Sequence, residues 1–273
     1  MKIGYNMSTV INKESLKKAE NDGCNFIQIF TGDPGKFIYN AKPIINQHLI
    51  NWKGGIVIHG NFLINLCRPS IDKIAKNSIY LLKKDLEIAT KINAIGVIIH
   101  MGKDTAKLGY QKALDIYINN LNIILRESEK GIIILETGAG VGTEVGTRLN
   151  ELGKIRDKVI DKERIKFCID TCHIFAAGYD LSDDIIVDSL ENYIENTLGW
   201  NNIITLHCND SKNCMCSKKD YHADITDGII SKENIGSFMK FINMFKKRDI
   251  PIILETPADS VELSTQIDFI KFY

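Results

Sequence analysis

The sequence lacks net charge, long apolar stretches and a recognisable leader. Its 34 Lys and Arg residues balance its 34 Asp and Glu residues, which excludes binding driven by a polybasic tail, although a local basic patch would escape this count. No uninterrupted apolar run approaches the roughly 18 residues of a membrane-spanning helix. The opening residues, MKIGYNMSTV, lack the apolar core of a signal peptide. We therefore expect a soluble intracellular protein without a membrane partner, with the cytoplasm, a nucleus and a viral replication compartment all open.

The sequence also lacks a linker. No Ser-, Gly- or Pro-rich segment and no shift of composition divides the 273 residues, and a chain of this length can bury one sizeable core. Hydrophobic residues make up 44% and charged residues 25%, which is ordinary for a globular protein and argues against a disordered or fibrous chain. We therefore expect a single domain spanning residues 1–273.

Cysteine is present in an odd number, seven. In a large chain without a secretory signal this favours reduced thiols over a disulfide framework. Cys208, Cys214 and Cys216 lie close together in sequence, and metal binding is one interpretation of them. Their C-x5-C-x-C spacing is not that of a standard zinc ribbon or finger.

Short apolar, β-branched runs recur along the chain. Several are apolar on both faces, as buried parallel strands are, and the segments between them are long enough for a crossover helix. The pattern predicts eight βα units, which is the size of a (β/α)8 TIM barrel; an open sheet split between two domains is the alternative, because strand pairing cannot be read from one sequence. The eight runs are Lys2–Asn6, Phe26–Phe30, Gly55–Gly60, Gly96–Met101, Gly131–Thr137, Ile165–Asp170, Asn202–Cys208 and Pro251–Thr256.

Six of the runs carry a residue type that binds metals at their last position or one residue before it, and barrel enzymes place their chemistry at the carboxyl ends of the strands. Three more such residues follow the sixth and seventh runs. A single histidine at a strand end is more often a hydrogen-bonded core residue, but nine such side chains meeting at one barrel mouth would be costly unless cations held them together. The nine are His59, His100, Glu136, Asp170, His173, His207, Asp220, His222 and Glu255.

Imidazole combined with carboxylate suits zinc or a neighbouring first-row metal better than magnesium or calcium, which prefer oxygen ligands. Nine ligands are too many for one tetrahedral ion and suit a cluster of two or three. Two ions held close together are the recurring device for in-line displacement at phosphorus. The residues therefore predict metal-assisted hydrolysis of a phosphoester.

Several motifs match a known family. HGNFLINL begins at His59, FCIDTCH ends at His173, HCNDSK begins at His207, and DYH ends at His222. ETGAGVG from Glu136 and ETP from Glu255 match as well. From the first strand to the last, the chain resembles the endonuclease IV family, the metal-dependent apurinic/apyrimidinic (AP) endonucleases of DNA base-excision repair.

The resemblance implies a (β/α)8 barrel that holds three Zn²⁺ ions, with Mn²⁺ an alternative at some sites. It implies that His59 and His100 bind the first ion and that Glu136 bridges it to the second, which Asp170, His207 and Glu255 complete. His173, Asp220 and His222 would hold the third ion. Glu136 would be the catalytic residue, as the bridging carboxylate beside a nucleophilic hydroxide.

The substrate implied by the resemblance is double-stranded DNA that contains an abasic site, bound by a monomer. Hydrolysis of the phosphodiester 5′ to that site would leave a 3′-hydroxyl and a 5′-deoxyribose phosphate, and 3′-repair phosphodiesterase activity is left open. Phe62 and Leu63 stand where the family inserts an apolar wedge into the duplex, or they pack behind His59. Phosphate contacts would come from Lys36, Arg68 and Lys212, unless these are ordinary surface cations.

Some positions depart from the family pattern. Tyr221 stands in place of the usual Arg, Cys216 in place of a glycine, and Met101 in place of the usual proline, while Gly35 stands where a basic residue is expected. None of these changes removes a ligand. They bear on the DNA footprint and on the loop near the third ion.

Two other functions are compatible with these motifs. A divalent-metal sugar isomerase or epimerase of the same barrel architecture also binds metal at its strand ends, but it has no use for the third ligand set. A DNA-lesion binding protein that has lost hydrolysis is the second alternative, although the complete ligand set argues against it.

Overall fold

The computed structural model describes residues 1–7, 11–37 and 47–273. All eight predicted runs form parallel strands of one sheet, in the spatial order β1-β10-β7-β6-β5-β4-β3-β2. The (β/α)8 barrel prediction is confirmed and the open sheet is excluded, while the extent of a single domain over residues 1–273 stays a prediction. The strands are β1 (Ile3–Tyr5), β2 (Phe26–Phe30), β3 (Gly55–His59), β4 (Val97–Ile99), β5 (Ile133–Glu136), β6 (Ile165–Asp170), β7 (Ile203–His207) and β10 (Ile252–Leu254).

The barrel closes between the first strand and the second. Asn6 and Gln28 form an isolated parallel bridge, and the Met7 amide donates to the Gln28 carbonyl at 2.8 Å. A Cβ at Gly4 would lie only 1.7 Å from the carbonyl oxygen of Phe26. The chain therefore needs glycine at this position, since any side chain would force β1 away from β2.

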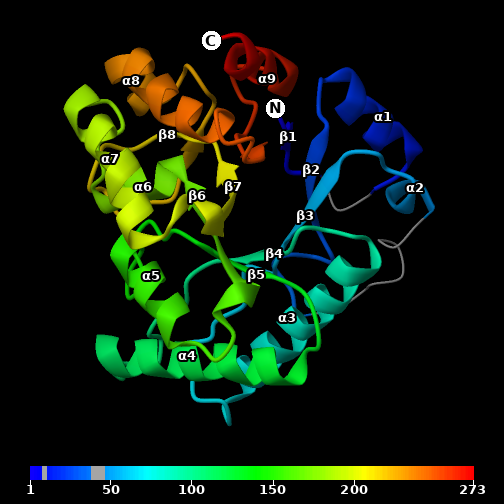
Figure 1. Cartoon of the computed structure of the whole chain (residues 1–273), viewed down its shortest axis with the longest axis vertical. Helices are drawn as coiled ribbons and strands as arrows, with labels where there is room; N and C mark the ends of the chain where they lie inside the picture. Colours follow the sequence, from blue (N-terminus) through cyan, green and yellow to red (C-terminus); the bar gives the residue numbers. More distant parts are fainter. Residues whose placement is uncertain (8–10, 38–46) are drawn as a thin grey trace.

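Helices surround the strands on the outside (Figure 1). The first turn of α3 is capped by the Asp72 carboxylate, which accepts from the Ile74 amide at 2.7 Å. The α-helices are α1 (Lys13–Asn21), α2 (Gln47–Ile50), α3 (Lys73–Lys91), α4 (Tyr110–Glu127), α5 (Leu149–Lys158), α6 (Thr171–Ala177), α7 (Asp184–Thr197), α8 (Ile229–Lys246) and α9 (Leu263–Phe272). Two short 3-10 helices, Lys162–Arg164 and Trp200–Asn202, precede β6 and β7.

One feature was not predicted from the sequence. A small antiparallel hairpin follows β7, in which β8 (Asp210–Ser211) pairs with β9 (His222–Ala223). The Lys212 amide extends the hairpin by donating to the Tyr221 carbonyl at 2.9 Å. The hairpin folds the chain back, so that His222 returns to the end of the strand that carries His207.

The barrel strands separate two apolar regions. The larger cluster lies between the strands and the helices, and a smaller one consists of Phe26, Val57, Ile98, Ile134, Cys168 and Ile253. Because side chains alternate along a strand, the residues of the smaller cluster face the barrel interior. We call this cluster the inner apolar layer.

None of the helices in the described ranges combines the length and the apolar character that crossing a membrane requires.

Candidate metal centre

Five of the six ligand-type residues at strand ends stand directly above the inner apolar layer, and the sixth, His207, stands above Thr205. His59, His100, Glu136, Asp170 and Glu255 follow members of that layer by two residues on the same strand. Two residues are one full repeat of the strand, so these side chains also point into the barrel, about 6.6 Å further along it. The fold therefore gathers them at the carboxyl end of the strands.

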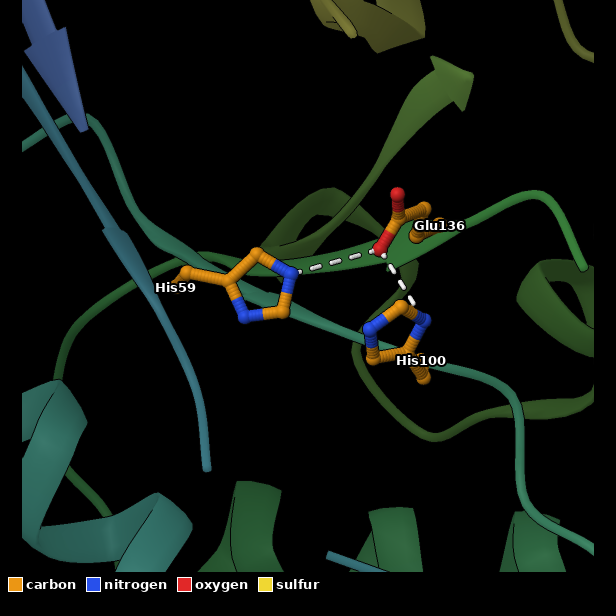
Figure 2. Close-up of side chains that lie close together, drawn as sticks. All are labelled: His59, His100 and Glu136. Carbon is orange, nitrogen blue, oxygen red and sulfur yellow. Dashed lines mark ion pairs between the residues drawn. The ribbon is translucent and has the colours of Figure 1, made fainter. Parts of the chain in front are cut away.

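Glu136 is the centre of the first ligand set. Its Oε2 lies 3.3 Å from His100 Nδ1 and 3.5 Å from His59 Nε2, and Figure 2 shows both imidazoles turned toward the carboxylate. Glu136 is completely buried, whereas the His100 side chain keeps 28% of its exposure. Three residues from three adjacent strands thus offer ligand atoms to one point.

Glu136 also belongs to the second ligand set. Its other oxygen, Oε1, lies 2.7 Å from His207 Nδ1. The same nitrogen lies 3.1 Å from Glu255 Oε2 and 3.8 Å from Asp170 Oδ2. The two carboxylate oxygens of Glu136 therefore face two different ligand sets.

The third ligand set combines a helix with the loop of the small hairpin. Asp220 Oδ1 lies 3.0 Å from His173 Nε2 and 3.1 Å from His222 Nε2. His173 stands in the first turn of α6, where its amide donates to the N-cap carboxylate of Asp170 at 2.9 Å. Asp170 therefore fixes the position of His173 besides contributing to the second set.

The structure brings together all nine residues predicted from the sequence, in the three groups expected. Within each group the ligand atoms lie within 4.8 Å of one another. Two thiols that the sequence did not single out lie near them, Cys168 beside Glu136 and His207, and Cys172 beside Asp170 and His222. Cys214 and Cys216 are exposed and enter none of the ligand groups found among the described residues.

Four of the five ligand-type histidines have an oxygen atom within hydrogen-bond distance of the ring nitrogen that faces away from the ligand sets. This contact orients the ring. The Nδ1 atoms of three of these histidines face backbone carbonyls, His59 at 2.8 Å from Gly60, His173 at 2.8 Å from Thr137, and His222 at 3.3 Å from Glu255. His207 has the opposite arrangement, because its Nε2 faces the Gln28 side chain at 2.7 Å. Such contacts fix which ring nitrogen remains free to bind a metal.

The electrostatics of the centre keep the carboxylate of Glu136 ionised, whereas burial raises the pKa of Asp170. Burial raises the pKa of Glu136, but His100 and His207 outweigh burial and hold this pKa well below its usual value. Burial lowers the pKa of His100 to about 4, against the attraction of Glu136. Burial also lowers the pKa of His222, but Asp170 and Asp220 reverse the effect and raise it to about 9. At neutral pH the centre thus contains an ionised Glu136, a neutral His100 and a protonated His222.

These residues fit a cluster of metal ions. Glu136 Oε2 is buried without a hydrogen-bond partner among the described residues, although two imidazoles lie near it. A buried carboxylate oxygen without a donor is costly unless a cation satisfies it. The donors are imidazole nitrogens and carboxylate oxygens, which suit zinc-class ions.

A cavity of about 510 Å³ opens beside the first and third ligand sets. Phe62 and Leu63 lie on its wall and keep 53% and 37% of their exposure. The Phe62 ring also packs 5.3 Å from the His59 ring and 5.6 Å from the His100 ring. The Phe62 ring therefore packs on the ligand histidines and still presents a face to solvent. Its role as a wedge in the DNA duplex stays a prediction.

The three cations proposed to contact phosphate all have acidic partners. Lys36 pairs with Asp33 at 2.7 Å, Arg68 with Asp72 at 2.8 Å, and Lys212 with Asp259 at 3.0 Å. A phosphate would have to compete with these carboxylates. Their role in DNA binding stays a prediction.

Two polar residues that the sequence analysis missed contact the ligands. Asn209 donates from Nδ2 to Asp170 Oδ2 at 2.7 Å and accepts from the Glu255 amide at 2.9 Å. Gln28 contacts His207 and Glu255. The available signals were position, since Asn209 stands two residues after His207, and Gln28 is the one polar residue of the run FIQIF.

The glycines at positions 138, 140 and 142 form a loop around the half-buried carboxylate of Glu144. The amides of Gly140 and Val141 donate to Glu144 Oε2 at 2.8 and 3.2 Å. Gly140 and Gly142 have φ angles of +83° and +65°, which glycine adopts without strain. These glycines therefore serve the geometry of the turn around Glu144. Their G-x-G-x-G spacing also lacks the third glycine of a dinucleotide-binding loop.

Comparisons with known proteins agree on one family. A family model described as "Xylose isomerase-like TIM barrel" matches residues 16–272. An endonuclease 4 of Acanthamoeba polyphaga mimivirus is 37% identical over 264 residues, which cover 90% of this chain and 82% of the relative. An apurinic-apyrimidinic endonuclease of Caenorhabditis elegans is 30% identical over 266 residues, which cover 93% of this chain and 66% of the relative.

Solved structures agree on the fold. Endonuclease IV of Thermus thermophilus superposes with a TM-score of 0.80 at 23% sequence identity, covering 99% of this chain and 98% of that one. Together with the family model and the mimiviral relative, this shows that the chain belongs to the endonuclease IV family of xylose isomerase-like TIM barrels.

Proposed function

We propose that this protein is a metal-dependent AP endonuclease of DNA repair, which hydrolyses the phosphodiester 5′ to an abasic site in double-stranded DNA. The products would be a 3′-hydroxyl and a 5′-deoxyribose phosphate. The observation that carries the proposal is the placement of Glu136, whose two carboxylate oxygens face two ligand sets while a third set lies alongside. The names of the relatives support the same activity.

The nine ligand residues would hold three Zn²⁺ ions, with Mn²⁺ as an alternative at some sites. When bound, such ions act as Lewis acids on a phosphate and lower the pKa of water toward neutrality. Glu136 would be shared by the first and second ions and would be the catalytic carboxylate. His173, Asp220 and His222 would serve the third ion, beside the leaving oxygen.

The cavity would receive the abasic nucleotide. An abasic nucleotide has no base to unstack, so extruding it from the duplex costs less than the few kcal/mol needed for an intact one. The exposed face of Phe62 and the neighbouring Leu63 would fill the gap in the duplex, as apolar wedges do in kinked DNA. Lesion recognition and hydrolysis would thus use adjacent walls of one cavity.

A sugar isomerase or epimerase is the main alternative. Such an enzyme needs one or two ions, so the third ligand set would have no purpose in it. The close approach of Asp220 to both His173 and His222 therefore favours the nuclease. A DNA-lesion binding protein without hydrolysis would not need a metal-type centre at all.

Elemental analysis of the purified protein, combined with an abasic-duplex assay, tests the proposal. We expect about three zinc-class ions per chain and cleavage 5′ to the lesion that stops with chelator and returns with Zn²⁺. A duplex with a blocked 3′ end at a nick would test the 3′-phosphodiesterase activity in the same preparation. Ketose isomerisation without DNA cleavage would overturn the proposal in favour of a sugar enzyme, and tight lesion binding without product would overturn it in favour of a binding protein.

A further inference from the structure

Gln28 stands two residues after a member of the inner apolar layer. At the equivalent position, five other strands have a metal-type ligand. Gln28 follows Phe26 of the inner apolar layer by two residues, as Glu136 follows Ile134 and Asp170 follows Cys168. Its side chain therefore points into the barrel at the level of the ligands. Gln28 is completely buried, so its amide must be satisfied by protein groups.

The amide of Gln28 joins two ligands of the second set. Its Nε2 donates to Glu255 Oε1 at 2.6 Å, and its Oε1 lies 2.7 Å from His207 Nε2. A weaker contact of 3.4 Å runs from Nε2 to Asn6 Oδ1, near the closure of the barrel. One buried side chain thus holds a carboxylate and an imidazole that come from two neighbouring strands.

The chemistry of the partners fixes the orientation of this amide. An ionised carboxylate can only accept, so the NH₂ group must face Glu255 and the oxygen must face His207. An amide oxygen can only accept as well, so His207 Nε2 must carry a hydrogen. The lone pair of the neutral ring is then on Nδ1, the atom that faces Glu136, Asp170 and Glu255.

His207 differs in this respect from the other oriented histidines. His59, His173 and His222 have Nδ1 against a backbone carbonyl, so their Nε2 is directed to the ligand sets. Only the ring of His207, among these four, turns its Nδ1 toward the centre, and only this ring is fixed by a side chain. A substitution can therefore remove the orienting group without changing the backbone.

We infer that Gln28 is a positioning residue that sets the tautomer of His207 and the direction of Glu255 for the second ion. The inference rests on the proposed function, because it assumes that the second ligand set binds metal. Groups that orient metal ligands through a hydrogen bond typically contribute 10- to 100-fold in metal affinity. Substitution of Gln28 should therefore lower the binding affinity for one ion of the cluster by a similar factor.

The first test uses the unmodified protein loaded with Zn²⁺. Nitrogen-15 NMR of the imidazoles distinguishes a metal-bound nitrogen from one that carries hydrogen. We expect His207 to bind through Nδ1 and to retain a slowly exchanging hydrogen on Nε2, whereas His59, His173 and His222 bind through Nε2. Coordination of His207 through Nε2 would overturn the inference, whatever the stability of any variant.

The second test compares Gln28→Met with Phe26→Leu. Methionine has a similar length but cannot make either hydrogen bond, and Phe26→Leu disturbs the same strand and the same interior without touching a ligand. The metal-free proteins are titrated with Zn²⁺ against a competing chelator. We expect Gln28→Met to bind one ion about 10- to 100-fold more weakly than the parent protein, and Phe26→Leu to bind all ions as the parent does.

The outcomes separate this inference from the proposed function. A parent protein that binds no metal, or that binds metal without cleaving abasic DNA, contradicts the proposed function. A parent protein that binds and cleaves, together with equal metal affinity in Gln28→Met and Phe26→Leu, contradicts only the role of Gln28.

Discussion

The two layers inside the barrel differ in chemistry although they lie on the same strands. The inner apolar layer contains five apolar side chains and one buried thiol, whereas the layer two residues further along consists of imidazoles, carboxylates and one amide. The separation is about 6.6 Å, a single repeat of the strand. The difference shows that the apolar layer can support the barrel while the next layer provides the chemistry, so substitutions in the two layers should have distinct effects.

Glu136→Gln should give the largest effect in the polar layer. Glutamine keeps the size of the side chain but has one oxygen where the two ligand sets require two. We expect the kcat/KM for abasic-duplex cleavage to fall on the order of 10³-fold or more, with the thermal unfolding of the protein little changed. Activity near that of the parent protein would refute the shared role of Glu136.

Ile134→Ala is the matching change in the apolar layer, two residues earlier on the same strand. Ile134 is completely buried, and removing a buried isoleucine side chain typically costs about 2–5 kcal/mol. We expect urea unfolding to show a loss in this range, with metal content and kcat retained at a temperature where the variant is folded. If metal content fell as it does after a ligand substitution, the two layers would not be separable.

Asp85 on α3 is a buried carboxyl outside the barrel interior, and its pKa can be compared with that of Glu136. Its buried carboxyl accepts a hydrogen bond from the Thr31 hydroxyl, and burial raises its pKa from 3.8 to about 7, whereas the imidazoles around Glu136 lower the pKa of that carboxyl. The folded protein therefore holds the proton of the Asp85 carboxyl more tightly than the unfolded chain does. The stability that the protonated carboxyl contributes is present at low pH and is lost as pH rises from about 4 through about 7.

Asp85→Asn removes this titration and keeps an acceptor for Thr31. The stability of the variant relative to the parent protein should therefore increase between pH 5 and pH 8, by on the order of 2 kcal/mol. Denaturant unfolding of both proteins at the two pH values measures the difference. Parallel pH profiles would show that Asp85 titrates normally in the folded protein.

Phe62→Ala should give the smallest of these effects. It removes the exposed ring on the cavity wall but no ligand, so we expect about tenfold weaker binding of an abasic duplex with metal content unchanged. Leu63→Ala, at the neighbouring position, provides a comparison in which less apolar surface is lost. A fall in metal content in Phe62→Ala would instead assign the ring to packing against His59 and His100.

The strands and the polar groups at their ends were predictable because both signals are local. A buried parallel strand is apolar on both faces, so a histidine or carboxylate at its end, such as His100 or Glu255, is conspicuous. The hairpin that returns His222 to the end of the strand carrying His207 was not predicted, because β8 and β9 have only two residues each. The ion pairs of Lys36, Arg68 and Lys212 were not predicted either, because their partners are set by loop geometry.

The barrel and the nine ligand-type residues could be predicted from the amino-acid sequence, because strand periodicity and residue chemistry are both readable along the chain. Only the tertiary structure decided which oxygen of Glu136 faces which ligand set, and that the amide of Gln28 lies between His207 and Glu255. Those arrangements depend on the register and closure of strands that are up to 227 residues apart in the chain. Hydrogen bonds across such separations form only once the barrel is assembled.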